Sequence, residues 1–408
     1  MKIFRLIVCF FLFFILTGCQ NDLPDPVEPD TEITLEIWET YNEDEQEVFL
    51  DIIEEFKKEN PNISIELNSI GHGKGWEELQ KGLAMGNLPD IAFVDMKHIS
   101  ALAEAGAIVN LNYLGADELA EQLISSAVKS NTYGGGIFGL PQKVETKVLY
   151  YNKTLFDEAN VSYPTEEWTW DNLINFSKPL TKNNNYGYGM GNSLEETLPK
   201  FYSYGAELTN DSQGQFTLDS EAGLKALELK NSLCNEYQVA AGAWKDDFFN
   251  PREGFVQQKY GMIIDSSERF SFYDEKLELG VEMVPKGTYG SVSSIQGDSM
   301  VILKDSDYPH EAYEFVKFLT SAEIQTLWFE QLGSIPVNKE ALNAVSTDDN
   351  FDVILKQATQ TQPRLTVPQY NVIEDIVNEK ISLVLKGEKT PEQALKEATE
   401  KVNNKLFN

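Results

Sequence analysis

Apolar and polar residues alternate between residues 33 and 94 in a pattern that predicts strands and helices in turn. Residues 33–38, ITLEIW, alternate strictly, which is typical of a half-buried strand. Apolar residues between Val48 and Phe56 then recur at helical spacing, and Asn42 stands three residues before Glu45, as in a capping box. The pattern next predicts a strand, a helix and a strand at residues 63–70, 76–85 and 91–94. This order is typical of a parallel sheet with helices on both faces.

A second alternating region follows residue 140 and predicts another sheet with its own helices. Its strands are expected at residues 147–151, 262–264, 281–284 and 300–303, and its helices near residues 170–180, 194–204 and 220–236. The final helix has Thr390 as N-cap, Pro391 at its first position and Gln393 to complete a capping box. Since open parallel sheets bind ligands beyond the carboxyl ends of their strands, two such lobes predict a cleft between them.

The first nineteen residues have the parts of an export signal in the expected order. Lys2 and Arg5 precede an unbroken apolar run, Leu6 to Leu16, which is shorter than the ~20 residues that a membrane-spanning helix needs. The run leads into Leu16-Thr17-Gly18-Cys19, which resembles the bacterial lipobox. That resemblance implies that residues 1–18 are removed and that Cys19 is lipidated. An ordinary secretory signal with a chance cysteine is the alternative.

The segment after Cys19 is interpreted as a tether between the lipid and the folded part. Residues 20–32 hold three prolines and five acids, a composition that stays extended and solvated. No later segment has 18 continuous apolar residues, the length that a spanning helix requires. Cys234 lies in a helical apolar pattern and is predicted to be a buried thiol.

Acidic residues outnumber basic residues along the whole chain. Lys and Arg total 33 and Asp and Glu total 65, which gives a net charge of −32 with His neutral. A surface of this charge repels phosphate backbones and anionic membranes, so a nucleic-acid partner and a basic membrane patch are both excluded. The three histidines have no metal-ligand spacing and no Cys-x-x-Cys is present, so we expect no metal and no cofactor.

Two features of the sequence could belong to an enzyme, a glycine-rich segment and the many acidic residues. Residues 71–75, GHGKG, precede a predicted helix but lack the phosphate-loop pattern. We interpret Gly73 and Gly75 as turn residues, or as points where the backbone approaches a ligand. No Gly-x-Ser-x-Gly elbow is present. A carboxylate pair for glycoside hydrolysis stays open, although no pattern among the 65 acids selects one.

Several motifs together resemble the extracellular solute-binding proteins of ABC sugar importers, the family 1 or maltose-binding-like group. They stand at residues 33–38 (ITLEIW), 86–95 (GNLPDIAFVD), 139–153 (GLPQKVETKVLYYNK), 167–173 (EWTWDNL), 312–319 (AYEFVKFL), 384–387 (VLKG) and 390–395 (TPEQAL). The resemblance covers essentially all of residues 33–408. It is specific for the family and does not specify the ligand.

The resemblance implies a periplasmic-binding-protein-like α/β fold (type II) with two lobes, each a mostly parallel sheet flanked by helices. Its domain boundaries place lobe 1 at residues 33–142 and 299–345, lobe 2 at residues 147–285 and 346–408, and the hinge crossings at residues 141–146 and 285–299. It also implies a lipid-anchored monomer on the outer face of the bacterial cytoplasmic membrane, which closes on a carbohydrate and delivers it to the ABC transporter permease without performing chemistry.

Carried over residue by residue, the resemblance implies ligand contacts in loops after strands and near the hinge. The expected ligand-binding residues are Trp38, Thr40, Tyr41, Asn42, Asp95, Glu145, Tyr204, Glu268, Arg269, Asp298 and Tyr370. This chain departs from the family at one of these points, since Glu268 or Arg269 stands where a ligand-stacking tryptophan is frequent. That departure indicates a more polar contact.

The residue types leave alternatives open for the polar candidates. Asn42 and Asp95 also fit simple helix caps. Glu145 also fits a salt bridge in the hinge. Gly297 and Asp298 are expected in a glycine-rich loop beside the ligand.

The aromatic candidates have alternatives of their own, because most aromatic side chains belong to cores. Trp38 either stacks on a sugar ring or closes the first helix. Tyr204 and Tyr370 either stack on the ligand or pack in the second lobe. The placement of these three rings therefore decides between ligand and core.

Three functional alternatives stay open beside carbohydrate import. The same fold serves as a ligand-sensing partner of membrane receptors. Related folds also bind polyamines, glycerol phosphates or metal chelates. Because the candidate contacts are more acidic than basic, a phosphorylated ligand is disfavoured and a cation such as a polyamine is not. A secreted glycoside hydrolase is the third alternative.

Overall fold

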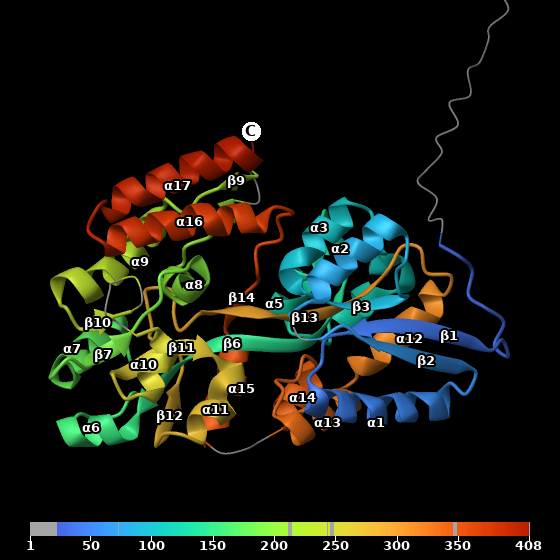
Figure 1. Ribbon diagram of the computed structural model, residues 1–408, viewed down its shortest axis with the longest axis horizontal. Coiled ribbons are helices and arrows are strands. Elements are labelled where there is room, and N and C mark those ends of the chain that lie inside the picture. Colours follow the sequence, from blue (N-terminus) through green and yellow to red (C-terminus); the bar gives the residue numbers. More distant parts are fainter. Residues whose placement is uncertain are drawn as a thin grey trace, which may run out of the picture.

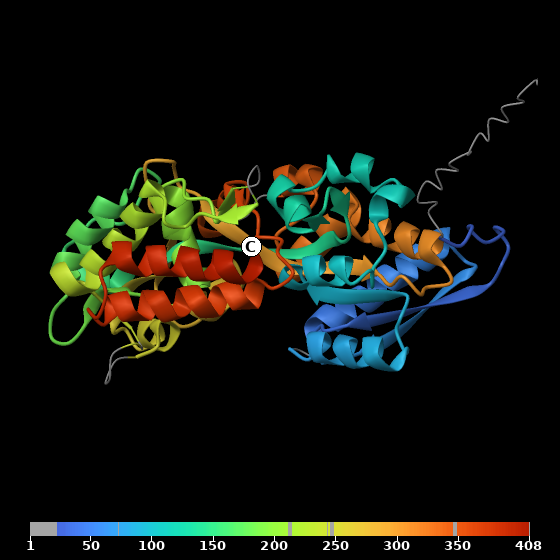
Figure 2. The same ribbon diagram turned by 90° about the horizontal axis from the view of Figure 1, so that it is seen from above.

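The computed structural model describes residues 23–71, 73–210, 214–242, 244, 249–345 and 349–407. These residues form two lobes of helices around one continuous mixed sheet (Figure 1). Viewed from above, α16 and α17 cover one lobe alone (Figure 2). The expected leader and Cys19 lie outside the described residues, so both stay predictions.

The main sheet runs in the order β10-β7-β11-β6-β13-β3-β1-β2, with β12 paired to β6 and β14 paired to β13. Its strands are β1 (Ile33–Glu39), β2 (Ile63–Ser69), β3 (Ile91–Asp95), β6 (Leu140–Asn152), β7 (Tyr186–Gly189), β10 (Ala240–Ala241), β11 (Tyr260–Ser266), β12 (Leu279–Glu282), β13 (Ser293–Ile302) and β14 (Thr361–Gln362). Two small hairpins stand apart, β4 (Thr132–Tyr133) with β5 (Gly136–Ile137) and β8 (Thr209–Asn210) with β9 (Gln215–Phe216).

The first lobe carries α1 (Glu43–Glu59), α2 (Gly75–Met85), α3 (Ile99–Glu104), α4 (Ala116–Ala120), α5 (Ser125–Ser130), α12 (Pro309–Leu319), α13 (Ala322–Leu332) and α14 (Lys339–Ala344). The second lobe carries α6 (Lys153–Ala159), α7 (Trp170–Leu180), α8 (Leu194–Ser203), α9 (Glu221–Asn231), α10 (Pro251–Val256), α11 (Phe270–Asp274), α15 (Asp349–Ala358), α16 (Tyr370–Leu385) and α17 (Pro391–Leu406). Short turns of helix are η1 (Met96–His98), η2 (Leu111–Leu114), η3 (Ser232–Glu236) and η4 (Ser267–Arg269).

The long strands β6 and β13 join the lobes. They pair antiparallel from Leu140 to Thr146 in β6, and β13 pairs in turn with β3. Beyond Thr146, the same β6 pairs with β11 and β12 in the second lobe. Figure 1 shows both strands running side by side across the middle of the molecule. Residues on their exposed face therefore lie between the lobes.

Three apolar clusters hold the sheet and its helices together. One extends from Phe49 and Phe315 in the first lobe to Tyr273 in the second. A second fills the space between the second-lobe sheet and its helices and includes Cys234, as predicted. A third packs α2 and α3 on the first-lobe strands. Because the first cluster continues beneath the crossing strands, the floor between the lobes is well supported.

Most predicted elements are confirmed, and their caps explain their boundaries. Strands β2, β1 and β3 are parallel neighbours. Asn42 and Glu45 form the predicted capping box of α1, and Thr390 with Gln393 forms that of α17. No helix among the described residues combines the length and the apolar character needed to cross a membrane.

The region before residue 300 was predicted wrongly. Strand β13 begins at Ser293, so Gly297 and Asp298 lie inside a strand and not in a loop. A β-bulge between Asp298 and Ser299 shifts the register against β6. Gly297 has φ +138°, and a Cβ there would lie 2.0 Å from the carbonyl oxygen of Lys143. The glycine therefore permits close pairing of the two crossing strands.

Candidate ligand-binding cleft

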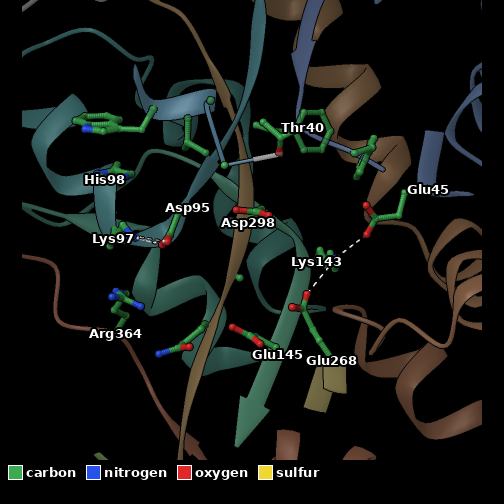
Figure 3. Close-up of a pocket in the computed structure, with 18 residues that line it drawn as sticks. Thr40, Glu45, Asp95, Lys97, His98, Lys143, Glu145, Glu268, Asp298 and Arg364 are labelled. Carbon is green, nitrogen blue, oxygen red and sulfur yellow. Dashed lines mark hydrogen bonds and ion pairs between the residues drawn. The ribbon is translucent and has the colours of Figure 1, made fainter. Parts of the chain in front are cut away.

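A cavity of about 310 Å³ opens between the lobes where β1 and β3 end beside the crossing strands (Figure 3). It is lined by Thr40, Tyr41, Glu45, Gly73, Gly75, Trp76, Phe93, Val94, Asp95, Lys97, His98, Lys143, Glu145, Glu268, Gln296, Gly297, Asp298 and Arg364. Carboxylates and cations thus share the lining with aromatic rings. Such a mixture suits a polar ligand that also has an apolar face.

Each cation of the cavity is engaged by a carboxylate. Lys97 Nζ lies 3.1 Å from Asp95 Oδ2. Lys143 Nζ lies 2.6 Å from Glu45 Oε1 and 3.0 Å from Glu268 Oε1, and so joins α1 of the first lobe to η4 of the second. Burial opposes the charge of Lys143, but Glu268 and Glu45 together raise the pKa of its ammonium.

Arg364 belongs to the segment that connects β14 to α16. Its Nη2 lies 3.0 Å from Glu195 Oε1, and its backbone N–H donates to Ser130 Oγ at 2.9 Å. Glu195 also accepts hydrogen bonds from Tyr370 Oη at 2.5 Å and from Gln296 Nε2. Arg364 is only 8% exposed, so this network fixes a charged group at the cavity wall between α5 and α8.

Asp298 faces Asp95 across strands β13 and β3 in the centre of the cavity (Figure 3). Burial raises the pKa of Asp298 to about 7, and the neighbouring Asp95 adds to the rise. Burial acts on Asp95 in the same sense, but Arg364 and Lys97 lower the pKa of that carboxyl. Burial and the nearby Glu268 raise the pKa of Glu145. On the cavity floor, Asp95 therefore ionises more easily than an ordinary carboxyl, whereas Asp298 and Glu145 ionise less easily.

The aromatic part of the wall is a stacked pair from α2 and η1. The rings of Trp76 and His98 lie 3.7 Å apart and 2° from parallel. Burial lowers the pKa of His98 to about 4, so the imidazole is neutral at pH 7. At the start of α2, Gly75 leaves room for Thr40, since a Cβ would lie 2.8 Å from its Cγ2. Both residues line the cavity, and each ring covers one face of the other.

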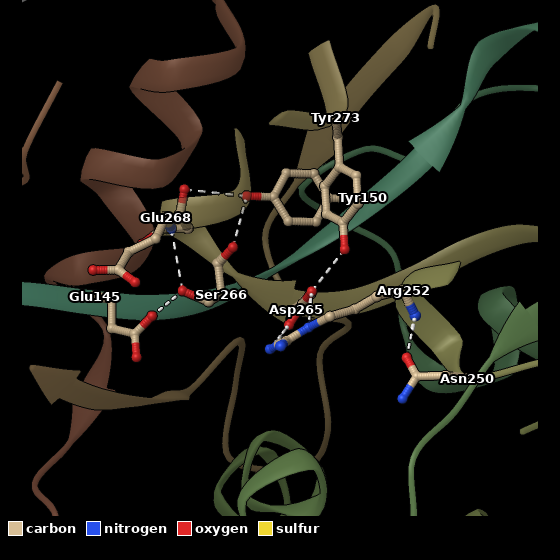
Figure 4. A network of polar contacts seen from close by, with 9 residues as sticks. Glu145, Tyr150, Asn250, Arg252, Asp265, Ser266, Glu268 and Tyr273 are labelled. Atoms are coloured by element: carbon tan, nitrogen blue, oxygen red, sulfur yellow. Dashed lines mark hydrogen bonds and ion pairs between the residues drawn. The ribbon is translucent and has the colours of Figure 1, made fainter. Parts of the chain in front are cut away.

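A polar network holds the corner between β11 and η4, from which Glu268 reaches the cavity (Figure 4). Arg252 pairs with Asp265 through Nε at 2.8 Å and Nη2 at 2.9 Å, and Tyr273 Oη donates to Asp265 Oδ2 at 2.8 Å. Ser266 Oγ donates to Glu145, which links the corner to β6. The corner is thus fixed on both sides.

Replacing Arg252 with Met is expected to lower the free energy of unfolding by about 2 kcal/mol, because Asp265 stays buried without its bidentate partner. Asp265 is 5% exposed. Urea unfolding followed by circular dichroism measures the change. The control is Lys225→Met, which removes an exposed i,i+4 pair with Glu221 and should cost less than about 0.5 kcal/mol. Equal costs in the two variants would contradict the importance of the corner network.

Comparison with known proteins shows the family to which the chain belongs. The sequence matches the family described as "Bacterial extracellular solute-binding protein" over residues 42–326. The chain belongs to this family. That finding confirms the resemblance that the sequence motifs indicated.

Two relatives, one from Bacillus and one from Streptococcus, are similar to this chain over almost its whole length. The arabinooligosaccharide-binding protein of Bacillus subtilis (strain 168) is 23% identical and covers 99% of both chains. The maltooligosaccharide ABC transporter solute-binding lipoprotein of Streptococcus pneumoniae (strain ATCC BAA-255 / R6) is 22% identical over 94% of this chain and 92% of its own. The crystal structure of the cyclic alpha-maltosyl-1,6-maltose binding protein from Arthrobacter globiformis has a TM-score of 0.83 at 19% identity, covering 91% and 98%. This likeness confirms the predicted fold class.

In this solute-binding protein, the cavity brings together six of the eleven expected ligand residues: Thr40, Tyr41, Asp95, Glu145, Glu268 and Asp298. Asp95 is also the N-cap of η1, so both readings of this residue fit its position. Asn42 and Arg269 line a neighbouring cavity of about 390 Å³, which shares Glu45, Lys143 and Glu268 with the first. The cap reading of Asn42 describes its observed contact.

The remaining three expected residues, all aromatic, do not line the cavity. Trp38 is 9% exposed and packs in the core between α2 and the sheet, so the structure contradicts ring stacking. Tyr370 is 2% exposed and sits behind Arg364, whose guanidinium carbon lies 4.7 Å above its ring. Tyr204 caps the end of α8 and packs against the second-lobe core. Core packing, the alternative for Tyr204 and Tyr370, describes the positions of those two rings. Trp38 also packs in a core, which neither of its two predicted roles anticipated.

Several lining residues were missed. Strand periodicity offers a signal for two of them, because residues two apart on a strand share a face. Lys143 shares a face with Glu145, and Gln296 shares one with Asp298. Trp76 follows the glycines that were interpreted as a turn or a ligand approach, and Gly73 and Gly75 both line the cavity. Lys97 and His98 belong to η1, which directly follows β3, whereas nothing in the sequence marks Arg364.

No group of three or more His, Cys, Asp or Glu side chains within the described part of the chain is arranged to hold a metal ion.

Proposed function

We propose that this protein captures a carbohydrate in the interlobe cavity and delivers it to the permease of an ABC importer. The observation that carries the proposal is that the stacked rings of Trp76 and His98 line the same cavity as the half-buried polar side chains of the crossing strands. A sugar ring has an apolar face that packs on an aromatic ring and hydroxyls that hydrogen-bond to carboxylates, amides and guanidinium groups. The names of the relatives above support the same ligand class.

Capture is expected to involve closure of the lobes around the crossing strands. The cavity takes Asp95 and Lys97 from the first lobe and Glu268 from the second, so a ligand between them contacts both. Contacts that exist only in the closed form shift the population toward that form. We keep the lobe boundaries stated above, with hinges at residues 141–146 and 285–299, as part of this proposal.

We place the mature protein on the outer face of the cytoplasmic membrane, anchored by lipid on Cys19. The lipobox resemblance and the name of the pneumococcal lipoprotein support this placement. A monomer is sufficient, because the cavity is formed within one chain. The protein acts by binding and release and needs no catalytic step. Mass spectrometry of the membrane fraction, with Cys19→Ala as control, tests the anchor.

Replacing Trp76 with Ala is expected to weaken carbohydrate binding by about 30-fold, which corresponds to a tryptophan contact of about 2 kcal/mol. The ring is half-buried at the edge of the first lobe, so the fold should persist. Titration calorimetry with the preferred sugar measures the effect. Leu83→Ala is the matched control, since Leu83 is 36% exposed on the same helix and does not line the cavity. Unchanged affinity in Trp76→Ala would contradict the stacking role.

A further inference from the structure

Asp298 occupies the centre of the cavity floor and forms no ion pair with any residue that the structure describes. It is the register partner of Asp95 on one side and of Lys143 on the other. The Lys143 ammonium turns instead to Glu45 and Glu268. Figure 3 shows Asp298 between Asp95 and the Lys143 group, with no interaction drawn to either.

The other cations of the cavity are engaged as well. Lys97 pairs with Asp95, and Arg364 pairs with Glu195. Of the lining residues, Glu45, Asp95, Glu145, Glu268 and Asp298 are acidic, whereas only Lys97, Lys143 and Arg364 are permanently basic. The lining is therefore two negative charges in excess when all carboxyls are ionised. A half-buried carboxylate in that field lacks a counter-charge.

Two further polar atoms point to the chemistry of the occupant. Tyr41 lines the cavity, and its hydroxyl is buried and has no hydrogen-bond partner in the described part of the chain. Nε of Arg364, a residue that is 8% exposed, is equally unpartnered. A ligand oxygen would satisfy Arg364, because guanidinium groups only donate. A ligand with N–H donors would satisfy both Asp298 and the oxygen of Tyr41.

We propose that the ligand carries a protonated amine that binds Asp298, so that an amino sugar is preferred over the neutral parent sugar. The proposal rests on the proposed function and narrows its ligand class. The hydroxyls of such a ligand supply the acceptor for Arg364, and its ring face can pack on Trp76. A polyamine shares the amine but has no oxygen for Arg364, so the observations favour the sugar.

The protonation of Asp298 provides an independent signature. Asp95 faces it from β3, Lys143 and Glu145 from β6, Glu268 from η4, and Tyr41 from the segment after β1. Burial raises its pKa to about 7 in the folded protein, from an ordinary value of 3.8. Between about pH 4 and pH 7, the folded protein therefore holds a proton on Asp298 that the unfolded chain has released. The contribution of Asp298 to the free energy of unfolding falls as the pH rises through this range. Asp298→Asn should raise the melting temperature of the ligand-free protein at pH 8 more than at pH 5.

The decisive test is titration calorimetry at pH 8 with wild-type protein and Asp298→Asn. The probes are glucosamine and galactosamine with their β-1,4-linked oligomers, the same sugars without the amine, and spermidine. We expect the amino form of one sugar to bind about 10- to 100-fold more tightly than its neutral parent, and Asp298→Asn to abolish that preference. Asp305→Asn, an exposed position after β13, should retain it.

The other outcomes separate this inference from the proposed function. Equal or tighter binding of the neutral sugars would overturn the inference and leave carbohydrate capture intact. Binding of spermidine alone would retain the amine at Asp298 and overturn the carbohydrate assignment. A preference for the amine that persists in Asp298→Asn would overturn the role of this carboxylate. Absence of binding across the panel would overturn the inference, and a stability shift with another carbohydrate would then leave carbohydrate capture intact.

Discussion

Arg364→Met should lower the free energy of unfolding by about 3 kcal/mol and also weaken ligand binding. Arg364 is 8% exposed and its guanidinium pairs with Glu195 at 3.0 Å. Removing one partner of a buried pair leaves the other charge uncompensated, which costs about 3–5 kcal/mol. Tyr370 and Gln296 still donate to Glu195, so we expect the low end of that range. Urea unfolding and titration calorimetry measure the two effects.

The double variant Arg364→Met with Glu195→Gln separates the charge from the packing. Since it removes both charges together, it should recover part of the lost stability. Ligand affinity should stay low, because the Arg364 side chain, which lines the cavity, is absent from both variants. Recovery of affinity in the double variant would show that Arg364 acts only by neutralising Glu195, and would contradict its ligand contact.

Gly297→Ala should disrupt the pairing of the crossing strands and cost more than about 3 kcal/mol. The added Cβ would lie 2.0 Å from the Lys143 carbonyl oxygen of β6, and φ at this residue is +138°. Backbone in the tightly paired centre of a sheet has little room to move away from such a contact. Thermal unfolding measures the stability, and binding should fall because Asp298 and Lys143 flank the altered position.

Gly106→Ala is the matched control for this change. Gly106 also has a positive φ, +66°, but its Cβ would meet nothing within 4 Å. Only the conformational strain then applies, which costs about 1 kcal/mol. Similar losses in the two variants would show that positive φ alone explains Gly297, and would contradict the close approach of β6 and β13.

Most helices and strands could be predicted from the sequence, because the patterns that predict them involve only residues close together in the chain. Alternation in residues 33–38 and the capping boxes at Asn42 and Thr390 give the correct elements, because they depend only on neighbours in sequence. The start of β13 was missed because Gly297 looks like a loop residue. Its glycine serves a contact with β6, more than 140 residues away in sequence, which no local pattern reveals.

The residues of the site could be predicted only in part, because some of them are placed by contacts between distant parts of the chain. Asp95 ends a predicted strand, so strand prediction locates it, whereas Glu145 was located by the resemblance to the family. Trp38 and Tyr370 are of the residue types that stack on sugar rings, but both pack in the cores. Burying a large apolar side chain stabilises the fold more than burying a small one. Arg364 enters the cavity from a connecting segment whose course depends on Ser130 and Glu195, and that course is a tertiary property.

Carbohydrate binding by the interlobe cavity is tested most directly by a thermal-shift panel on residues 20–408. The protein is first unfolded and refolded to remove any bound solute, and the panel contains neutral and amino mono- and oligosaccharides. At 100 times its dissociation constant a ligand adds about 2.7 kcal/mol of stability, which shifts the melting temperature measurably. We predict a saturable shift with one carbohydrate class that falls to about a third of its wild-type size in Trp76→Ala, as expected for a 30-fold loss of affinity, and is also smaller in Glu145→Ala. No shift with any carbohydrate, or an undiminished shift in both variants, would contradict capture in this cavity.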